Sequence, residues 1–373
     1  MSALLANAYL HSLDPIILPI SGDFAVRWYG LSYIAGFVLG WLIVWGMAKF
    51  HRSIIPAERV SDLVFAVIVG VLVGGRLGYV LFYQPSLLID FSGDFPFWGV
   101  LALNKGGMAS HGGIVGVILA GWWFSRRVNV PALHTIDVAA IACTPGLFLG
   151  RIANFINAEL WGRPLPETMQ AAPPWWSVKY PQEIYRWSTE QLAALREVVS
   201  EVGVSSRSWE QAVAIAERPE PPREAIEFLE RGQREIVQAL QAGNETVIEA
   251  VQPMLTAYYP SQIFQAIADG PVLLFILAMI WLKPRKPGVV GGSFLIGYGV
   301  LRILTELFRQ PDEGVALTFG LLSRGQTLSA LMIVIGLAIV WWSGRQDRPR
   351  LGGLIEPARP DHAATTEPVQ NAS

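Results

Sequence analysis

The sequence is poor in charge and nearly devoid of cysteine. Only 16% of its 373 residues are charged, whereas a soluble globular domain carries about a quarter. The single cysteine, Cys143, excludes an intramolecular disulfide and a cysteine-based metal cluster. Its apolar surroundings favour packing in the core over a nucleophilic role. The first residues carry no basic region ahead of an apolar stretch, so we expect no cleavable signal peptide.

Several catalytic motifs are also missing. The chain has no phosphate-binding P-loop, no pair of zinc-ligating histidines on one helix, no Gly-x-Ser-x-Gly elbow and no Cys-x-x-Cys pair. The sequence therefore gives no support to nucleotide-driven transport, metal-dependent hydrolysis or serine-based acyl transfer.

Hydrophobic residues are abundant instead. They make up 52% of the chain, together with 14 Trp and 36 Gly, two residue types favoured in and around membrane helices. A transmembrane helix needs about 20 mostly apolar residues. Seven stretches qualify, namely Trp28–Phe50, Val60–Tyr83, His111–Ser125, Ile136–Ala153, Ile263–Leu282, Gly291–Phe308 and Gln326–Trp342. This pattern predicts an all-α integral membrane protein with seven transmembrane helices.

The connecting segments predict an orientation. Basic residues cluster after the first, third, fifth and seventh spans, for example at Arg52, at Arg126 and Arg127, at Lys286 and at Arg348. The alternate short connections are poorer in basic residues. Under the positive-inside rule the C-terminus is cytoplasmic and the N-terminus lies outside, which agrees with an odd number of spans.

One long segment does not belong to the membrane. Residues 164–259 are rich in Glu, Arg, Gln and Ala, with helical patterns at Thr189–Val202 and Pro222–Ala242. We expect them to form a mostly helical extracytoplasmic head between the fourth and fifth spans, because long loops cross the membrane regardless of charge. The chain then divides into residues 1–163 with spans one to four, the head at 164–259, spans five to seven at 260–345, and a cytoplasmic tail at 346–373. The tail after Leu351 is short of large apolar residues and is expected to be disordered.

Glycines in the second and third spans predict close helix packing. Gly70, Gly74 and Gly78 repeat a four-residue spacing, as do Gly112 and Gly116. Small residues at this spacing let two membrane helices approach each other. This is a structural signal and indicates no particular chemistry.

The strongest chemical pattern lies in the sixth span. At about 100° per residue, Tyr298, Arg302, Glu306 and Arg309 fall within roughly 80° of one another on a helix. Glu306 could simply neutralise one arginine, with Arg309 at the water interface. One carboxylate cannot compensate two guanidinium groups fully, however, so the stripe favours an anionic ligand.

Further arginines extend this pattern. Arg76 lies inside the second span, and Arg151 near the end of the fourth is followed by Asn154 and Asn157. Arginine is well suited to phosphate because its planar fork donates two parallel hydrogen bonds. The arginines together predict a phosphate-bearing ligand, with Arg76 among its contacts.

Two other residues leave their roles open. His111 is flanked by Gly106, Gly107, Gly112 and Gly113, and could be a proton acceptor or only a helix cap. Tyr29 follows Arg27 and Trp28, where an interfacial anchor is the simplest interpretation of the residues alone.

At these residues the sequence resembles the prolipoprotein diacylglyceryl transferase family. The resemblance covers nearly all of the chain except the head and the tail. Its segments are Arg27–Tyr33, Gly74–Tyr83, Gly106–Gly113, Gly150–Pro164, Pro260–Gly270, Tyr298–Asp312 and Gly325–Ser329, and the one beginning at Gly150 is close to the family signature.

The resemblance implies a reaction. The family transfers an sn-1,2-diacylglyceryl group from phosphatidylglycerol to the lipobox cysteine thiol of a prolipoprotein in the bacterial inner membrane. The products are a thioether and glycerol phosphate. The expected partners are therefore phosphatidylglycerol, prolipoprotein lipobox segments and membrane lipid, with no metal, no organic cofactor and no nucleic acid.

The resemblance also implies roles by position. Arg151 and Arg302 match essential arginines of the family, and its other functionally important positions are matched by His111, Tyr29, Asn154, Tyr298, Glu306 and Arg309. We expect catalytic roles for His111, Arg151, Arg302 and Tyr29. His111 either accepts the thiol proton or orients the lipid. Phosphatidylglycerol binding is expected of Arg151, Asn154, Arg302, Glu306, Arg309, Tyr298 and Arg76.

Some positions depart from the family pattern. Phe264 and Gln265 stand where Tyr and Glu are usual, and Ala153 and Ala158 replace common glycines. Arg324 stands where Met is usual, and the head is longer than is typical.

Two other functions compete with the transferase. A lipid-binding or transport protein could hold a phosphate with the same arginines, but it would not need the signature residues with His111 and Asn154. A purely structural scaffold would not explain several arginines inside the membrane.

Overall fold

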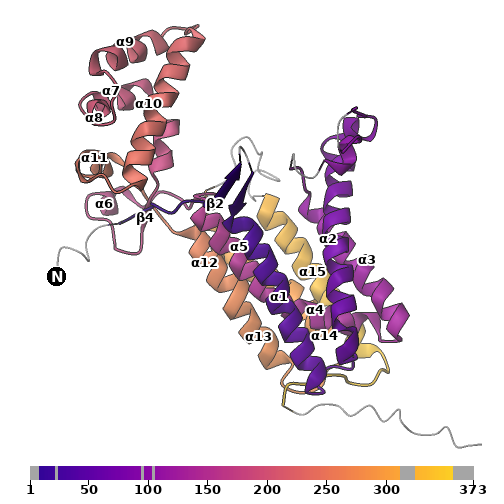
Figure 1. The fold of residues 1–373 in the computed structure, drawn as a ribbon. Coiled ribbons are helices and arrows are strands. Elements are labelled where there is room, and N and C mark those ends of the chain that lie inside the picture. The colour runs from indigo at the N-terminus through magenta and orange to yellow at the C-terminus, as the bar shows by residue number, and fades with distance from the viewer. Residues whose placement is uncertain (1–7, 22–23, 94–95, 103–105, 311–323, 356–373) are drawn as a thin grey trace, which may run out of the picture. The chain divides into compact units, whose positions relative to one another are not determined.

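The structure of the chain is a computed structural model that describes residues 8–21, 24–93, 96–102, 106–310 and 324–355. It is mostly helical, with 67% of the described residues in helices. The chain forms two compact units (Figure 1). The first unit comprises Met1–Ser32, Gly150–Ala266 and Leu304–Leu317, and the second comprises Tyr33–Leu149, Ile267–Ile303 and Thr318–Ser373.

Long apolar helices dominate the chain. Their bounds are Trp28–Lys49 (α1), Val60–Phe82 (α2), Ser110–Val128 (α3), Ala132–Ala142 (α4), Thr144–Ile156 (α5), Ser261–Ile267 (α12), Leu273–Ile280 (α13), Val289–Glu306 (α14) and Arg324–Arg345 (α15). Within the described residues, six helical stretches are long and apolar enough to cross a membrane, with α4–α5 and α12–α13 each forming one of them. The remaining predicted span, His111–Ser125, forms the 19-residue helix α3, which is not among the six.

The fourth predicted span is broken in its middle. α4 ends at Ala142 and α5 begins at Thr144, whose hydroxyl donates a hydrogen bond of 2.9 Å to the Ile141 carbonyl. Pro145 at the start of α5 cannot donate the backbone hydrogen bond that a continuous helix requires. Cys143 at this junction is exposed, so the prediction that it packs in the core is wrong.

Glycines bring α2 and α3 together, as the spacing predicts. A Cβ atom added to Gly112 would lie 2.9 Å from the Cα atom of Gly78, and one added to Gly74 would lie 3.0 Å from the Cα atom of Gly116. Both distances are below ordinary contact, so a side chain at either position would separate the helices. The two helices run side by side in Figure 1.

A buried carboxylate orders the start of α14. Asp137 on α4 accepts backbone hydrogen bonds from Gly288 at 2.8 Å and from Gly291 at 2.6 Å. The first N–H groups of a helix have no partner within the helix, and the carboxylate supplies one.

The start of the predicted tail is ordered. The Leu351 carbonyl accepts a hydrogen bond of 3.1 Å from the Trp281 indole, and Leu351 pairs through its backbone with Arg285. The Ile355 backbone N–H donates to the Leu282 carbonyl at 3.0 Å. The prediction of disorder after Leu351 is therefore wrong for residues 352–355, and residues 356–373 lie outside the described residues.

The first unit contains short strands that the sequence did not predict. β1 (Tyr9–Leu10) pairs in parallel with β4 (Val178–Lys179), and β4 pairs antiparallel with β5 (Ala257–Tyr258). β2 (Ile16–Ser21) and β3 (Phe24–Arg27) form a separate antiparallel pair that leads directly into α1. The expected all-α fold is thus corrected to a mostly helical one.

Between β4 and β5 the chain forms a set of short helices with a core of its own. Their bounds are Thr189–Ala193 (α7), Val198–Glu201 (α8), Ser206–Ala216 (α9), Arg223–Gln241 (α10) and Glu245–Val251 (α11), while Glu167–Gln170 (α6) precedes β4. Trp209 is fully buried in this core, and its indole donates to the Leu192 carbonyl at 2.8 Å. The predicted helix Pro222–Ala242 is confirmed as α10, whereas the predicted Thr189–Val202 consists of α7, a 3₁₀ turn and α8.

Candidate functional site

Three polar side chains of the first unit meet at the start of α1. The Tyr29 hydroxyl donates a hydrogen bond of 2.9 Å to Oε2 of Glu159. The Asn154 side-chain amide donates to the same Tyr29 hydroxyl, and it lies 3.5 Å from Oε2 of Glu159. The phenol thus accepts from the amide and donates to the carboxylate, which fixes the direction of both hydrogen bonds.

The segment that follows α5 is pinned so that Glu159 can reach Tyr29. The Glu159 backbone carbonyl accepts a hydrogen bond of 2.6 Å from the Gln262 side chain, and the Leu160 carbonyl accepts one of 3.0 Å from the Ser261 hydroxyl. Ala158 and Leu160 hold positive φ angles of 51° and 56°. The chain therefore turns sharply on either side of Glu159, and α12 holds the turn in place.

Arg151 lies one turn before Asn154 on α5. Residues three apart on a helix share a face, so the guanidinium and the Asn154 amide project from the same side of α5. Arg151 is partly buried and Asn154 is 8% exposed. α5 thus carries a cation and an amide donor side by side, a combination suited to an anionic ligand.

Glu306 and Arg309 form a buried ion pair, but not on one continuous helix. Their Oε2 and Nη1 atoms are 3.8 Å apart, and both side chains are about one-tenth exposed or less. α14 ends at Glu306, and Arg309 instead pairs through its backbone with Gly162. The prediction that Arg309 continues the helical stripe is therefore wrong. The sequence has Pro311 two residues later, and the residue before a proline avoids the helical conformation.

Close backbone approach explains how Arg309 is held. A Cβ atom on Gly162 would come within 3.0 Å of the Phe308 carbonyl oxygen. The Arg163 side chain donates to the Arg309 carbonyl at 3.1 Å, and its backbone N–H donates to the Phe308 carbonyl at 2.9 Å. The signature segment and the end of α14 are thereby joined within the first unit.

The other two members of the predicted stripe lie on α14 itself. Tyr298 and Arg302 stand two turns and one turn before Glu306, so the three project from one face of that helix. Tyr298 and Arg302 are partly buried, and the Tyr298 ring stacks on Phe294 with ring centroids 5.8 Å apart. The helical part of the predicted stripe is confirmed.

Arg76 is buried and its guanidinium is surrounded by carbonyl groups. It donates to Val100 at 2.7 Å, to Gly99 at 2.6 Å, to Gly106 at 2.5 Å and to Gly107 at 3.0 Å. Arg76 is only 5% exposed. This environment differs from the phosphate contact that the sequence predicts.

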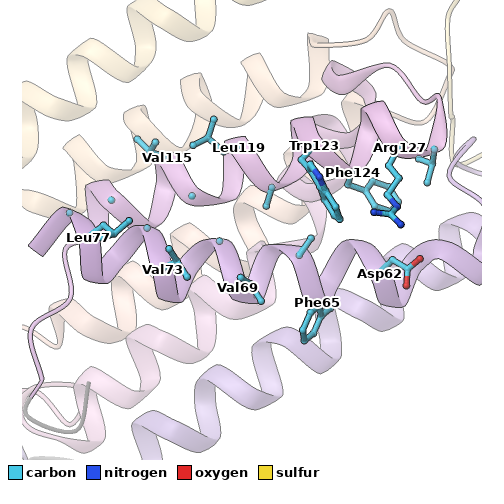
Figure 2. A pocket seen from close by; sticks show the side chains of 18 of the residues that line it. Asp62, Phe65, Val69, Val73, Leu77, Val115, Leu119, Trp123, Phe124 and Arg127 are labelled. Carbon is cyan, nitrogen blue, oxygen red and sulfur yellow. The ribbon is translucent and has the colours of Figure 1, made fainter. Parts of the chain in front are cut away.

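His111 lies in the first turn of α3 and lines a groove along α2 and α3. The groove has a volume of about 1520 Å³. Figure 2 shows its apolar walls, which include Val73, Leu77, Val115 and Leu119. Walls of this kind suit a hydrocarbon chain.

Charged residues line the other end of this groove. Asp62 and Arg127 lie there, as Figure 2 shows. His111 and Arg127 are 16 residues apart on α3, which corresponds to about 24 Å along the helix. The groove therefore runs along most of the length of α3.

Sequence reasoning missed two polar residues near the predicted ones. Glu159 lies in the family segment Gly150–Pro164 but is not among the predicted site residues, although it accepts the Tyr29 hydrogen bond. Arg163 was not considered, although it holds the Arg309 backbone. Both belong to the segment beginning at Gly150, so the density of polar residues in that segment was the available signal.

Comparisons with known proteins show which family the chain belongs to. The sequence profile of the prolipoprotein diacylglyceryl transferase family matches residues 15–342. A phosphatidylglycerol–prolipoprotein diacylglyceryl transferase of Bdellovibrio bacteriovorus is 42% identical over 345 residues, which cover 89% of this chain and 94% of the relative. A protein with the same name from Yersinia pestis is 34% identical over 349 residues, covering 93% of this chain and 100% of the relative. The chain therefore belongs to the prolipoprotein diacylglyceryl transferase family.

Proposed function

We propose that this protein transfers the sn-1,2-diacylglyceryl group of phosphatidylglycerol to the lipobox cysteine of prolipoproteins, the first step of bacterial lipoprotein maturation. The observation that carries the proposal is the hydrogen-bonded set of Tyr29, Asn154 and Glu159, with Arg151 one turn away on α5. These residues lie within the part of the chain that matches the family. The relatives from Bdellovibrio bacteriovorus and Yersinia pestis are both named phosphatidylglycerol–prolipoprotein diacylglyceryl transferase.

The reaction displaces a phosphate from carbon. The cysteine sulfur attacks the glycerol carbon that bears the phosphate, the carbon–oxygen bond breaks, and glycerol phosphate leaves with the bonding electrons. The sulfur attacks as thiolate, so the thiol proton passes to a base. The nucleophile comes from the substrate protein, and the enzyme needs no reactive cysteine of its own.

The arginines have a defined task in this reaction. A phosphodiester becomes a monoester, so negative charge grows on the leaving phosphate. Guanidinium groups of Arg151 and Arg302 would bind this growing charge more tightly than the ground state, which lowers the barrier. Asn154, Tyr298, Glu306 and Arg309 orient the headgroup, and His111 accepts the thiol proton or orients the lipid.

We further propose that the chain crosses the bacterial inner membrane seven times. The helix α3 completes the set of six strongly apolar stretches, because it packs along α2 through glycines. Under the positive-inside rule, the basic clusters support a cytoplasmic C-terminus, with α6–α11 outside as the head. In a Cys143→Ser background, a membrane-impermeant maleimide should label Ser208→Cys in intact cells and Asp347→Cys only after lysis.

The release of glycerol phosphate tests the proposed activity. Purified protein with phosphatidylglycerol should release glycerol phosphate only when a cysteine-bearing lipobox peptide is present. The same peptide with serine in place of cysteine is the matched control, and it should give no release. Lipid binding without peptide-dependent release would favour a transport protein.

A further inference from the structure

The guanidinium of Arg76 is almost fully occupied by backbone carbonyls. Nε donates to Val100, Nη2 donates to Gly99, and Nη1 donates to both Gly106 and Gly107, over distances from 2.5 to 3.0 Å. A guanidinium has five N–H groups, so among the described residues four of them have a carbonyl partner and one does not. All the contacts lie within the second unit.

This arrangement leaves little for a phosphate. Tight phosphate recognition by arginine uses two parallel N–H groups of one fork. Arg76 has only one N–H to spare, and its side chain is closed off from solvent. With these partners, the Arg76 guanidinium does not offer phosphate two parallel N–H groups, which its predicted role as a phosphate ligand requires.

The carbonyls that Arg76 holds belong to two separate segments. Gly99 and Val100 belong to a 3₁₀ turn, while Gly106 and Gly107 come shortly before α3. Gly106 and Gly107 have φ angles of +78° and +84°, which favour glycine. One buried side chain thus ties both segments to α2.

The same region fixes the entry into α3. The backbone N–H of Ala109 donates to the Gly75 carbonyl at 2.9 Å, next to Arg76 on α2. Ser110 then begins α3, and His111 follows four residues after Gly107. The position of His111 thus depends on contacts made by consecutive residues of α2.

A second side chain, that of Tyr79, also contacts the segment that Arg76 holds. A Cβ atom on Gly107 would lie 2.8 Å from Cδ1 and from Cζ of the Tyr79 ring. The Arg76 guanidinium lies 5.7 Å from the centroid of that ring. Tyr79 therefore confines both Gly107 and the Arg76 side chain.

From this geometry we infer that Arg76 is a positioning residue, which holds the Gly106–Gly107 segment and thereby sets His111 at the start of α3. The inference rests on the proposed transferase activity, because His111 acts only in that reaction. It assigns to Arg76 a role that is distinct from the proposed phosphate ligands Arg151 and Arg302.

Replacing Arg76 by lysine separates positioning from phosphate binding. Arg76→Lys keeps the positive charge, but one ammonium with three N–H groups cannot reach carbonyls on both sides of the fork. We expect kcat to fall by about tenfold to a hundredfold, because a displacement of about 1 Å is enough for such a loss. The KM for phosphatidylglycerol should stay within about twofold of wild type, since headgroup binding is intact. Arg126→Lys, at an exposed arginine of α3 that does not line the groove, is the matched control and should leave both constants unchanged.

Hydrogen–deuterium exchange gives a readout independent of turnover. In Arg76→Lys the peptide covering residues 106–111 should exchange faster than in wild type, while peptides from α14 and from the head should not change. A residue that only bound phosphate would leave this exchange unaltered in the absence of lipid.

A second variant reaches the same segment without altering Arg76. Gly107→Ala would press a methyl group into Tyr79 at a positive φ angle. It should reproduce the loss of kcat with unchanged KM. Gly121→Ala in α3 is its control, because a Cβ atom there would lie 3.5 Å from the nearest atom, which is ordinary contact.

Three results would overturn the inference. The first is a KM for phosphatidylglycerol raised about tenfold or more in Arg76→Lys while kcat is preserved. The second is wild-type kcat and wild-type exchange in both Arg76→Lys and Gly107→Ala. The third is failure of both variants to fold in detergent. Such a failure would show that Arg76 is needed for the fold of the second unit as a whole and not only for the position of the Gly106–Gly107 segment. If wild type itself transferred no lipid, the proposed activity would fail, while the exchange measurement would still decide whether Arg76 holds residues 106–111.

Discussion

Ala158 occupies a backbone conformation that suits glycine. Its φ angle is +51°, in the turn that carries Glu159 toward Tyr29. A left-handed conformation costs a residue with a side chain roughly 1–2 kcal/mol. The sequence showed that Ala158 replaces a common glycine of the family, but not that the position has a positive φ angle.

Ala158→Gly should therefore stabilise the protein. The relief of strain exceeds the loss of about 0.5–1 kcal/mol that glycine causes through added freedom of the unfolded chain, so we expect a net gain of about 0.5–1 kcal/mol. Thermal unfolding of the purified protein in detergent measures it. Ala153→Gly is the matched control, because Ala153 lies buried inside α5 and glycine should lower stability there. If Ala158→Gly were less stable than wild type, the backbone of Ala158 would not be strained.

Tyr29 links Asn154 to Glu159 through a single hydroxyl. Tyr29→Phe removes both hydrogen bonds while keeping the ring, and should cost about 0.5–1.5 kcal/mol, because the Asn154 amide is buried whereas the exposed Glu159 carboxylate can bind water instead. Transfer activity should fall with it, since the Asn154 amide is no longer oriented. Tyr185→Phe, at a tyrosine 46% exposed, should change neither stability nor activity. Wild-type activity in Tyr29→Phe would show that the hydroxyl is dispensable.

At the scale of elements, hydrophobic length and glycine spacing predicted most of the helices. The first predicted span, Trp28–Phe50, corresponds to α1 at Trp28–Lys49, and the second, Val60–Tyr83, corresponds to α2 at Val60–Phe82. Such spans are predictable because every backbone group of a membrane helix must be satisfied within the helix.

Features that depend on distant contacts could not be predicted in this way. Arg309 leaves the helix to pair with Gly162, far away in sequence, and helical periodicity contains no information about that partner. The β1–β4–β5 sheet is made of strands of two residues each, too short for a periodic pattern. The carbonyl groups that surround Arg76 come from backbone, which carries no signature of residue type.

The packing of α2 on α3 should be sensitive to one methyl group. Gly112→Ala would place a Cβ atom 2.9 Å from the Cα atom of Gly78, and overpacking of this kind costs about 1–3 kcal/mol. The measurement is the midpoint of thermal unfolding followed by size-exclusion chromatography. Gly113→Ala on the same helix is the control, because its Cβ atom would lie 3.8 Å from the nearest atom. Equal stabilities for the two variants would show that the helices do not approach through Gly112.

At the scale of the whole molecule, a buried histidine links stability to pH. His11 is fully buried, its Nε2 donates to the Phe155 carbonyl at 2.8 Å, and its Nδ1 has no hydrogen-bond partner among the described residues. Burial lowers the pKa of His11 below its ordinary value of 6.5, because the interior disfavours the charged imidazolium by more than the hydrogen bond to the Phe155 carbonyl favours it.

The sign of the pH effect follows from this shift. The unfolded chain binds the His11 proton more tightly than the folded chain, so acid favours unfolding. The stability that neutral His11 contributes is complete above about pH 6.5, the ordinary histidine pKa, and is lost as the pH falls toward the lower folded pKa. Thermal unfolding from pH 8 to pH 5 should show a steeper loss for wild type than for His11→Gln. Parallel curves would contradict the role of His11.

The proposed activity of this chain is the transfer of a diacylglyceryl group from phosphatidylglycerol to a cysteine thiol. Mass spectrometry of a lipobox peptide after incubation with purified protein and phosphatidylglycerol tests it most directly. We expect the peptide to gain one diacylglyceryl group on its cysteine, in a bond that survives hydroxylamine as a thioether does, with an equal amount of glycerol phosphate released. An unmodified peptide in a preparation that still binds phosphatidylglycerol would contradict this activity.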